Sequence, residues 1–325
     1  MRMRTLVRET MLELDSKGIL QSIASKNDHD HAWRALELLG ISSLFLYPRI
    51  NWQPKSANIG AIVKDLNIGA DSCAFVDDSG FERAEVASGV AGIRVYPETD
   101  IPDLIKRPEF DVPVTEESRR RREFYVAESA RKQSAEGSSA NYEEFLRSCQ
   151  IEATIFQPSE PSHVERSLEL LQRTNQLNLS TRRYSRTELD ELLGDPDSVG
   201  ICTQAMDRFG EYGIVGFASL KRSNSRLDLV DFVMSCRVAE KKLENAWFKW
   251  LSSAALSAGY DKVYARYVKT ARNHVLLKAF TEAGFTEIEA EPTATVLALD
   301  CHVAPDLSDI VRNSNRSESR LLRRQ

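Results

Sequence analysis

A lysine and a pair of carboxylates stand where a parallel sheet would bring them together. Lys55 leads into an expected helix, and the apolar run that ends at Val76 is followed by Asp77 and Asp78. In a sheet of alternating strands and helices, such residues meet at the carboxyl edge, where ligands bind. Paired carboxylates suit Mg²⁺ because hard cations prefer oxygen ligands, and a nearby ammonium group stabilises phosphoryl charge. The alternative is a capped loop with a surface salt bridge.

The elements that must position these residues alternate between strand and helix. Apolar residues at about 3.6-residue spacing predict helices, and short apolar runs between turn residues predict strands. The helices are expected over residues 4–17, 29–39 and 56–67, and the strands over residues 19–24, 44–47, 73–76 and 93–96. This alternation predicts an α/β domain with a parallel, doubly wound sheet over residues 1–110.

Three polar signals follow strand ends or stand between a strand and a helix: Ser25, Lys55, and the pair Asp77 and Asp78. In this order they resemble the second, third and fourth motifs of the haloacid dehalogenase (HAD) phosphatase superfamily. The residues around these motifs are similar to those of the superfamily's narrower FkbH-like branch: Ile23-Ala-Ser-Lys-Asn-Asp28, Ile50-Asn-Trp-Gln-Pro-Lys-Ser56 and Phe75-Val-Asp-Asp-Ser79. The resemblance implies two ligand sets: Ser25, Lys26, Asn27 and Lys55 for phosphate, and Asp77 and Asp78 for Mg²⁺.

The family's first motif is Asp-x-Asp at the end of a strand that precedes the first helix, and this sequence shows no such strand ahead of residues 4–17. The first Asp of that motif is the family's nucleophile, so we expect no phosphate hydrolysis by this chain alone. In the family's sheet, the strand of that motif lies between the strands that here end at Ser25 and Asp77. Buried backbone groups do not stay unpaired. Three alternatives follow: the two strands pair directly, a separate polypeptide supplies the missing strand, or Met1 is not the true start.

Composition and charge indicate an ordinary globular chain of about two domains. The 325 residues are 42% hydrophobic and 28% charged, with a net charge of −5. No global basic field therefore attracts nucleic acid or a membrane. The five cysteines lack Cys-x-x-Cys spacing, which argues against a disulfide framework and a structural zinc site. No run approaches transmembrane length and no apolar leader is present, so we expect a cytoplasmic protein.

The composition shifts to charged and small residues over 111–149, which predicts a helical, flexible connector. Residues 150–300 then read as a strand, a helix, three antiparallel strands, a long helix, a strand, a helix and a final strand. This order is similar to the α+β fold of the N-acetyltransferase-like (GNAT) family. Residues 301–325 are polar and basic, and we expect them to form a frayed tail.

The turn before the long helix, Arg237-Val-Ala-Glu-Lys-Lys242, contains no glycine and carries the acidic Glu240. In GNAT proteins this turn is normally glycine-rich, so that backbone N–H groups reach a pyrophosphate at the helix N-terminus. A tight nucleotide cradle is therefore not expected here. Free acetyl-CoA is accordingly the less favoured substrate.

An unusually polar, amide-rich stretch runs over residues 173–184. One interpretation is a pocket wall that hydrogen-bonds an acyl or phosphopantetheine group. The other is a loop satisfied by its own side chains. On the first interpretation, the residues that bind the acyl group or its carrier are Asn175, Gln176, Asn178, Arg182, Arg237 and Asn273.

The same stretch and Val233-Met-Ser-Cys-Arg237 again look like the FkbH-like family, so the resemblance covers nearly the whole chain except the tail. That family loads a glyceryl unit from 1,3-bisphosphoglycerate onto an acyl carrier protein in polyketide-type pathways, removing phosphate as it does so. Cys236 would be the acyl acceptor, because thiolates are strongly nucleophilic and thioester exchange is nearly isoenergetic. Arg237 and His274 would lower its pKa. The alternative is a buried structural cysteine.

The leading hypothesis is thus a two-domain FkbH-like protein with Lys55 and Cys236 as catalytic residues and an incomplete phosphate-handling half. Its expected partners are an acyl carrier protein, a phosphorylated three-carbon substrate and Mg²⁺. One alternative is a non-catalytic remnant that binds the carrier or completes a partner, with a separate polypeptide supplying the missing strand. Another is a stand-alone GNAT-like acyltransferase.

Overall fold

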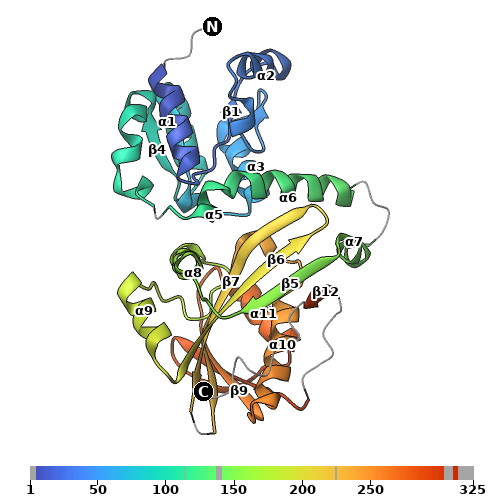
Figure 1. Cartoon of the computed structure of the whole chain (residues 1–325). Coiled ribbons are helices and arrows are strands. Elements are labelled where there is room, and N and C mark those ends of the chain that lie inside the picture. Colours follow the sequence, from blue (N-terminus) through green and yellow to red (C-terminus); the bar gives the residue numbers. More distant parts are fainter. Residues whose placement is uncertain (1–4, 113, 137–140, 224, 304–309, 314–325) are drawn as a thin grey trace. The chain divides into compact units, whose positions relative to one another are not determined.

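The chain folds into two compact units, Met1–Ser129 and Ala130–Gln325. A computed structural model describes residues 5–112, 114–136, 141–223, 225–303 and 310–313 (Figure 1). The boundary between the units falls inside helix α6 (Arg121–Glu136). Among the described residues, no helix combines the length and apolar character that a membrane span requires.

The first unit alternates short strands with helices, as its sequence predicts. Its strands are β1 (Ala24–Ser25), β2 (Arg49–Ile50), β3 (Ala74–Asp77) and β4 (Arg94–Pro97). Its helices are α1 (Thr5–Ser16), α2 (His29–Leu38), α3 (Lys55–Leu66), α4 (Gly80–Gly89) and α5 (Glu116–Arg119), with 3-10 segments η1 (Ser42–Leu44), η2 (Ala70–Ser72), η3 (Glu98–Lys106) and η4 (Pro108–Phe110). Local signals explain the helix ends: Asp28 caps α2, and Asn67 ends α3 in a left-handed conformation.

The predicted parallel pairing is present, but a continuous sheet is not. β1 pairs with β2 and β3 pairs with β4, both in parallel, and the described residues contain no ladder between β1 and β3. Of the three alternatives for the missing strand, the structure therefore excludes direct pairing between β1 and β3. The core of this unit is divided into three small apolar clusters rather than one.

The strand predicted over residues 44–47 is wrong. Residues 42–44 form a 3-10 turn, Tyr47 has a positive φ of 47°, and the pairing strand is β2, further along the chain. The apolar side chains Leu44 and Leu46 are nevertheless buried. A short apolar run predicts that its residues are buried more reliably than it predicts a strand. Here the run is buried, but it forms a turn. The strand expected over residues 19–24 likewise shrinks to β1 and an isolated bridge at Gln21.

The second unit is built on one mixed eight-stranded sheet. Its order is β10-β11-β9-β8-β7-β6-β5-β12, in which β8 pairs with β9 and β12 with β5 in parallel while the other neighbours are antiparallel. The strands are β5 (Ile151–Phe156), β6 (Ser198–Asp207), β7 (Gly210–Arg222), β8 (Leu227–Met234), β9 (Lys262–Val268), β10 (Thr286–Ala290), β11 (Ala294–Asp300) and β12 (Val311–Asn313). The elements predicted for residues 150–300 are present in the predicted order, and the structure adds a helix at residues 186–194 and strand β10, which were not predicted from the sequence.

Helices cover both faces of this sheet (Figure 1). The helices are α7 (Tyr142–Cys149), α8 (Pro161–Arg173), α9 (Arg186–Gly194), α10 (Leu243–Ser257) and α11 (His274–Glu282). Residues of α7, α10 and α11 join the large main core, and residues of α8 and α9 join a smaller second core. Burying apolar surface on both faces provides the main stabilisation of such a layered domain.

The predicted connector over residues 111–149 is divided between the units. Phe124 is buried, and Tyr125 packs in an apolar cluster of the first unit. Phe145 and Leu146 of α7 instead belong to the main core of the second unit. The flexible break expected over residues 133–141 begins inside α6, and residues 137–140 lie outside the described part of the chain. Of the predicted tail, β12 adds an edge strand, and most of the remainder is likewise outside that part.

Candidate functional site

The first unit joins Lys55 and Asp77 in a nearly buried ion pair. Lys55 is the first residue of α3 and Asp77 the last of β3, with 2.5 Å between Nζ and Oδ2. The two side chains are 12% and 9% exposed. The other Asp77 oxygen, Oδ1, accepts the backbone N–H of Ser79 at 2.9 Å. The sequence correctly predicts that Lys55 and Asp77 lie close together. In the structure, both carboxylate oxygens of Asp77 are occupied, one by Lys55 and the other by the Ser79 N–H.

The N-terminus of α3 is already satisfied by a carboxylate. Glu85 of α4 accepts the backbone N–H of Ser56 at 3.1 Å and also its hydroxyl. Gly89 permits this approach of α4, since a Cβ there would lie 2.7 Å from the Ser56 Cβ. A helix N-terminus attracts anions. Any phosphate bound here would therefore compete with Glu85, a residue that the sequence alone does not single out.

The remaining predicted phosphate ligands lie at the end of β1. Ser25 is half-buried, and its carbonyl accepts the Asn51 N–H at 3.0 Å. Lys26 is exposed and forms an ion pair with Glu82 at 3.0 Å. Asn27 is exposed, and its Oδ1 accepts the next backbone N–H at 2.8 Å. The two lysines of the predicted phosphate site are thus each held by a carboxylate of the chain.

The described residues contain no group of three His, Cys, Asp or Glu side chains placed to hold a metal ion. Asp78 is exposed, while Asp77 is occupied by Lys55 and Ser79. Mg²⁺ is usually held by one or two carboxylates together with water, so an ion at Asp77 Oδ2 would have to replace the Lys55 ammonium group. Binding of Mg²⁺ by Asp77 and Asp78 stays a prediction.

In the second unit, Cys236 follows the end of β8 and begins the 3-10 segment η5 (Cys236–Val238). It is half-buried, whereas Cys149, Cys202 and Cys301 are buried. Burial raises the pKa of the Cys301 thiol to about 11 and that of half-buried Cys73 to about 11. The neighbouring Ser235 hydroxyl accepts from Arg237 N at 3.4 Å and from its Nε at 3.3 Å, which orients Arg237 beside the thiol's segment.

The turn after Cys236 adopts left-handed backbone without glycine. Glu240 has a φ of 66° and Lys242 a φ of 62°. Such angles are strained for residues with a Cβ and free of strain for glycine. Lys242 is also the N-cap of α10 and forms no side-chain capping bond. The sequence correctly predicts a turn without glycine, and the structure adds that its backbone remains glycine-like.

Replacing Glu240 by glycine is expected to stabilise the second unit by about 1 kcal/mol, the cost of holding an ordinary residue in the left-handed region. Urea unfolding measures the change. The matched control is Ala239→Gly, because Ala239 has an ordinary φ of −54°. Glycine at that position only loosens the unfolded chain, so its substitution should destabilise slightly. A destabilised Glu240→Gly variant would contradict the assignment of strain to this turn.

The polar stretch over residues 173–184 is largely satisfied internally. Asn178 is buried, with its Nδ2 donating to Thr174 O at 3.1 Å and its Oδ1 accepting from Thr181 N at 2.8 Å. Asn273, also buried, accepts at Oδ1 from Tyr267 Oη at 2.7 Å and from Thr270 N at 2.9 Å. Direct ligand contact by either amide would first require one of these bonds to break.

The other predicted acyl-binding residues lie closer to the surface. Asn175 is exposed and accepts a hydrogen bond from Arg183, and Gln176 is half-buried. Arg182 is exposed, stacks over the ring of Tyr184 at 4.3 Å and pairs with Glu188 at 3.1 Å. The interpretation as a loop satisfied by its own side chains therefore accounts for most of this stretch.

A buried carboxylate that sequence reasoning missed organises the same region. Asp231 of β8 is 1% exposed and accepts three hydroxyl groups, from Ser180 at 2.5 Å, Tyr184 at 2.7 Å and Ser219 at 2.6 Å. Burial and the Asp231 carboxylate raise the pKa of the Tyr184 phenol well above its usual value. The sequence feature that could have revealed this site is the acidic residue Asp231 within the apolar run of β8.

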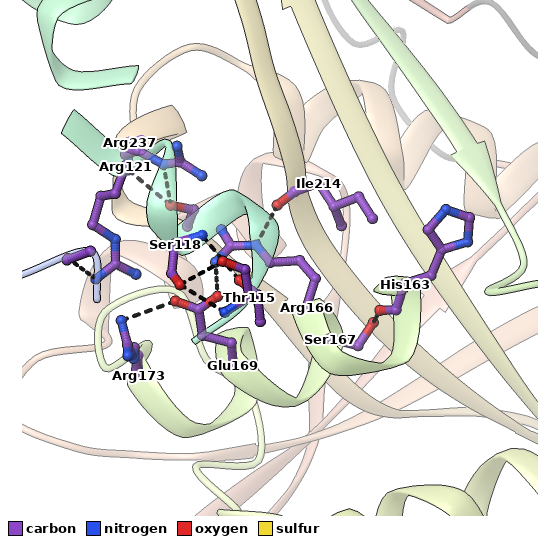
Figure 2. A network of polar contacts seen from close by, with 12 residues as sticks. Thr115, Ser118, Arg121, His163, Arg166, Ser167, Glu169, Arg173, Ile214 and Arg237 are labelled. Atoms are coloured by element: carbon purple, nitrogen blue, oxygen red, sulfur yellow. Dashed lines mark hydrogen bonds and ion pairs between the residues drawn. The ribbon is translucent and has the colours of Figure 1, made fainter. Parts of the chain in front are cut away.

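Helix α8 carries a second buried polar group that the sequence did not reveal. Figure 2 shows Glu169 between two arginines of this helix, Arg166 at 2.7 Å and Arg173 at 3.0 Å. Arg166 also donates from Nε to Ile214 O at 3.0 Å, which joins α8 to β7. Glu169 is 1% exposed, and the two guanidinium groups compensate its buried charge.

Comparisons with solved structures find neighbours that cover a little under half of this chain, at low identity and low TM-score. No family model and no curated protein matches the sequence. A domain from Methanocaldococcus jannaschii is 12% identical, with 46% of this chain and 99% of that chain covered and a TM-score of 0.39. The ribosomal-protein-S18-alanine N-acetyltransferase of Escherichia coli is 16% identical (47% and 97% covered, TM-score 0.37). The GNAT domain of Streptomyces lividans PAT is 14% identical (45% and 89% covered, TM-score 0.36).

Proposed function

We propose that the second unit accepts an acyl group on Cys236 and passes it to a thiol acceptor. The observation behind this proposal is the position of Cys236, half-buried directly after β8, in a chain whose other cysteines in this unit are buried. Reactive cysteines need access to solvent and substrate, whereas buried ones are inert. Arg237 follows the thiol in sequence, and its side chain is held beside this segment by the Ser235 hydroxyl.

The chemistry requires an activated acyl donor, for which an acyl phosphate is the simplest. The Cys236 thiolate attacks the carbonyl carbon, the bond from that carbon to the phosphate oxygen breaks, and phosphate leaves with the electron pair. The thiol proton is released to solvent. The resulting thioester then exchanges with an acceptor thiol at little change in free energy. No phosphorylated aspartate takes part, so the missing Asp-x-Asp motif does not prevent this transfer.

The finer proposal follows the FkbH-like resemblance: a glyceryl unit from 1,3-bisphosphoglycerate, delivered to an acyl carrier protein. Attack at the acyl phosphate releases only the phosphate on the carboxyl carbon. Removal of the second phosphate needs a hydrolytic site, and the first unit lacks the family's nucleophile. We therefore expect a phosphoglyceryl thioester, which still carries the phosphate on its third carbon.

Intact-protein mass spectrometry after incubation with 1,3-bisphosphoglycerate tests this function. We expect a phosphoglyceryl adduct on the wild type, its complete loss in Cys236→Ala, and its transfer to an added carrier protein. Cys73→Ala is the matched control, because Cys73 is the other half-buried cysteine and lies in the first unit. An adduct of equal yield on Cys236→Ala would rule out this thiol as the acceptor.

A second candidate function, completion by a partner, is favoured by the strands of the first unit. Parallel sheets are normally continuous and covered on both faces, yet β1 and β3 each pair along one edge only among the described residues. Ala74 of β3 is exposed, and α2 contains no buried residue. An extended segment of another polypeptide would fit between such edges by strand addition.

The purified chain alone should therefore not hydrolyse phosphate esters. Adding a synthetic apolar peptide that ends in Asp-x-Asp, together with Mg²⁺, should produce peptide binding and phosphate release, followed by isothermal titration and a phosphate assay. The control peptide carries Asn-x-Asn. Rapid Mg²⁺-dependent release without any peptide, or identical behaviour of the two peptides, would count against completion by a partner.

A further inference from the structure

The sheet of the second unit opens between two of its central strands. β8 and β9 are paired in parallel only at residues 227–229 and 263–265. Beyond these pairs, the last residues of β8 form no described ladder with β9, and their backbone groups need other partners. The divergence lies directly before Cys236, the proposed acyl acceptor.

Residues 177–179, which we call the internal strand, fill this opening. Leu179 N donates to Phe232 O at 2.9 Å, and Met234 N donates to Leu177 O at 2.9 Å. On the other side, Val268 N of β9 donates to Leu179 O at 3.1 Å. The internal strand is thus bonded to both diverging strands, with an antiparallel bridge to β8.

Two buried amides hold the internal strand in place. Asn273 donates from Nδ2 both to Asn178 O at 3.1 Å and to Val268 O at 2.8 Å, so one side chain joins the internal strand to β9. Asn178 bonds its own flanking backbone, and both amides are 1% exposed or less. Leu177 and Leu179 are buried in the main core. These contacts make the internal strand part of the sheet rather than a loose flap.

An open strand edge is a binding site for extended, amide-bearing ligands, which add to it through main-chain hydrogen bonds. The pantetheine arm of an acyl-CoA carries two amides and would use such an edge. Here the groups it would need, Phe232 O, Met234 N and Val268 N, are already bonded to the internal strand. We infer that the internal strand closes the second unit to the pantetheine arm, with Asn273 as its main positioning residue.

This inference rests on the proposed function and narrows its substrate class. The acyl donor must be small and must lack a pantetheine arm, and a carrier thiol must reach Cys236 without pairing to β8. The turn after Cys236 supplies a second reason, because it contains no glycine and so lacks the glycine-rich backbone that normally cradles a pyrophosphate. The internal strand occupies the strand edge that an extended pantetheine arm would use, whereas a compact acyl phosphate needs no such edge to reach Cys236.

Calorimetric titration with coenzyme A, combined with hydrogen exchange, tests the internal strand. On the wild type we expect no binding at millimolar coenzyme A and slow exchange at Leu179, Met234 and Val268, unchanged by the ligand. Asn273→Ala should speed exchange at these amides. Apparent affinity scales with the fraction of molecules in which the β8 edge is open, so this variant should show measurable binding at millimolar coenzyme A, where the wild type shows none. Asn175→Ala is the matched control on the same stretch, since Asn175 is exposed.

Wild-type binding of coenzyme A, whether or not it speeds exchange over residues 177–179, would overturn the inference. So would an Asn273→Ala protein with a loosened internal strand and no gain in affinity. If Asn273→Ala does not fold, the same titration and hydrogen-exchange measurements on the wild type and on Asn178→Ala test the inference. The proposed function is tested separately by the adduct on Cys236. If no adduct forms, the proposed function fails and the exclusion of coenzyme A still stands. If coenzyme A binds the wild type, the exclusion fails and an adduct on Cys236 would still support the proposed function.

Discussion

Replacing Arg131 by methionine is expected to lower the free energy of unfolding of the second unit by about 3–5 kcal/mol, the usual result of removing one partner of a buried ion pair. Arg131 contacts Asp207 through two bonds, Nε to Oδ2 at 2.7 Å and Nη2 to Oδ1 at 2.9 Å. The side chains are 4% and 0% exposed. Without the guanidinium, the Asp207 charge remains buried and uncompensated.

Urea unfolding followed by tryptophan fluorescence measures this loss. Arg147→Met is the matched control, because Arg147 forms a surface pair with Glu143 at 3.9 Å and is 55% exposed; its removal should change stability by less than about 1 kcal/mol. The double variant Arg131→Met with Asp207→Leu should recover most of the stability, since it leaves no buried charge. Equal losses for Arg131→Met and Arg147→Met would show that the ion pair does not stabilise the fold.

The same ion pair predicts a dependence on pH. Burial by itself raises the pKa of Asp207, but hydrogen bonds from Arg131 and Tyr212 outweigh it, and the net pKa is lowered. A lowered folded-state pKa contributes stability that is present above the unfolded pKa and lost as the pH falls through the folded value. Acid should therefore destabilise the wild type more than the double variant. Unfolding curves over a series of acidic pH values make the comparison, and parallel losses would contradict it.

Replacing Asp231 by alanine should destabilise the second unit by about 3 kcal/mol or more, since each buried hydroxyl left without an acceptor costs roughly 1–3 kcal/mol. Three hydroxyls depend on this carboxylate, those of Ser180, Tyr184 and Ser219. Because Ser180 and Tyr184 follow the internal strand, hydrogen exchange over residues 177–184 should also become faster.

Asp231→Asn is the more conservative variant and should retain part of the stability, because its amide oxygen still accepts. Asp228→Ala is the matched control on the same strand, since the Asp228 side chain is 34% exposed and pairs only with Arg226 at 2.8 Å among its described ion pairs. Chemical denaturation compares the three variants. If Asp231→Ala were no less stable than Asp228→Ala, the hydroxyl contacts would not be stabilising ones.

The two units differ in how they support chemistry. In the first unit, the charged groups expected to bind phosphate are paired with one another, Lys55 with Asp77 and Lys26 with Glu82. A ligand there must displace existing ion pairs. In the second unit, Cys236 follows β8 of an eight-stranded sheet, in which the internal strand fills the opening between β8 and β9. A rigid scaffold of this kind holds a reactive group in place better than short, half-buried strand pairs do.

The sequence by itself determined the order of most elements in the second unit, although not helix α9 or strands β10 and β12, and the position of the candidate residues along it. Apolar residues that recur with a period of 2 or 3.6 form local patterns, so they predict strands and helices without knowledge of the fold. The same holds for Lys55 at a helix start, for Asp77 at a strand end and for a turn without glycine between Arg237 and Lys242.

Only the tertiary structure decided which backbone groups pair across long stretches of chain. The internal strand meets β8 some fifty residues later in the sequence, and Arg131 meets Asp207 across a separation of 76 residues. Such contacts depend on how layers pack, and no local pattern in a single sequence encodes the partner. For the same reason, the sequence left open whether the polar stretch forms a pocket wall or a loop satisfied by its own side chains. In the structure, Asn178 and Asn273 hold the chain's own strand in the sheet.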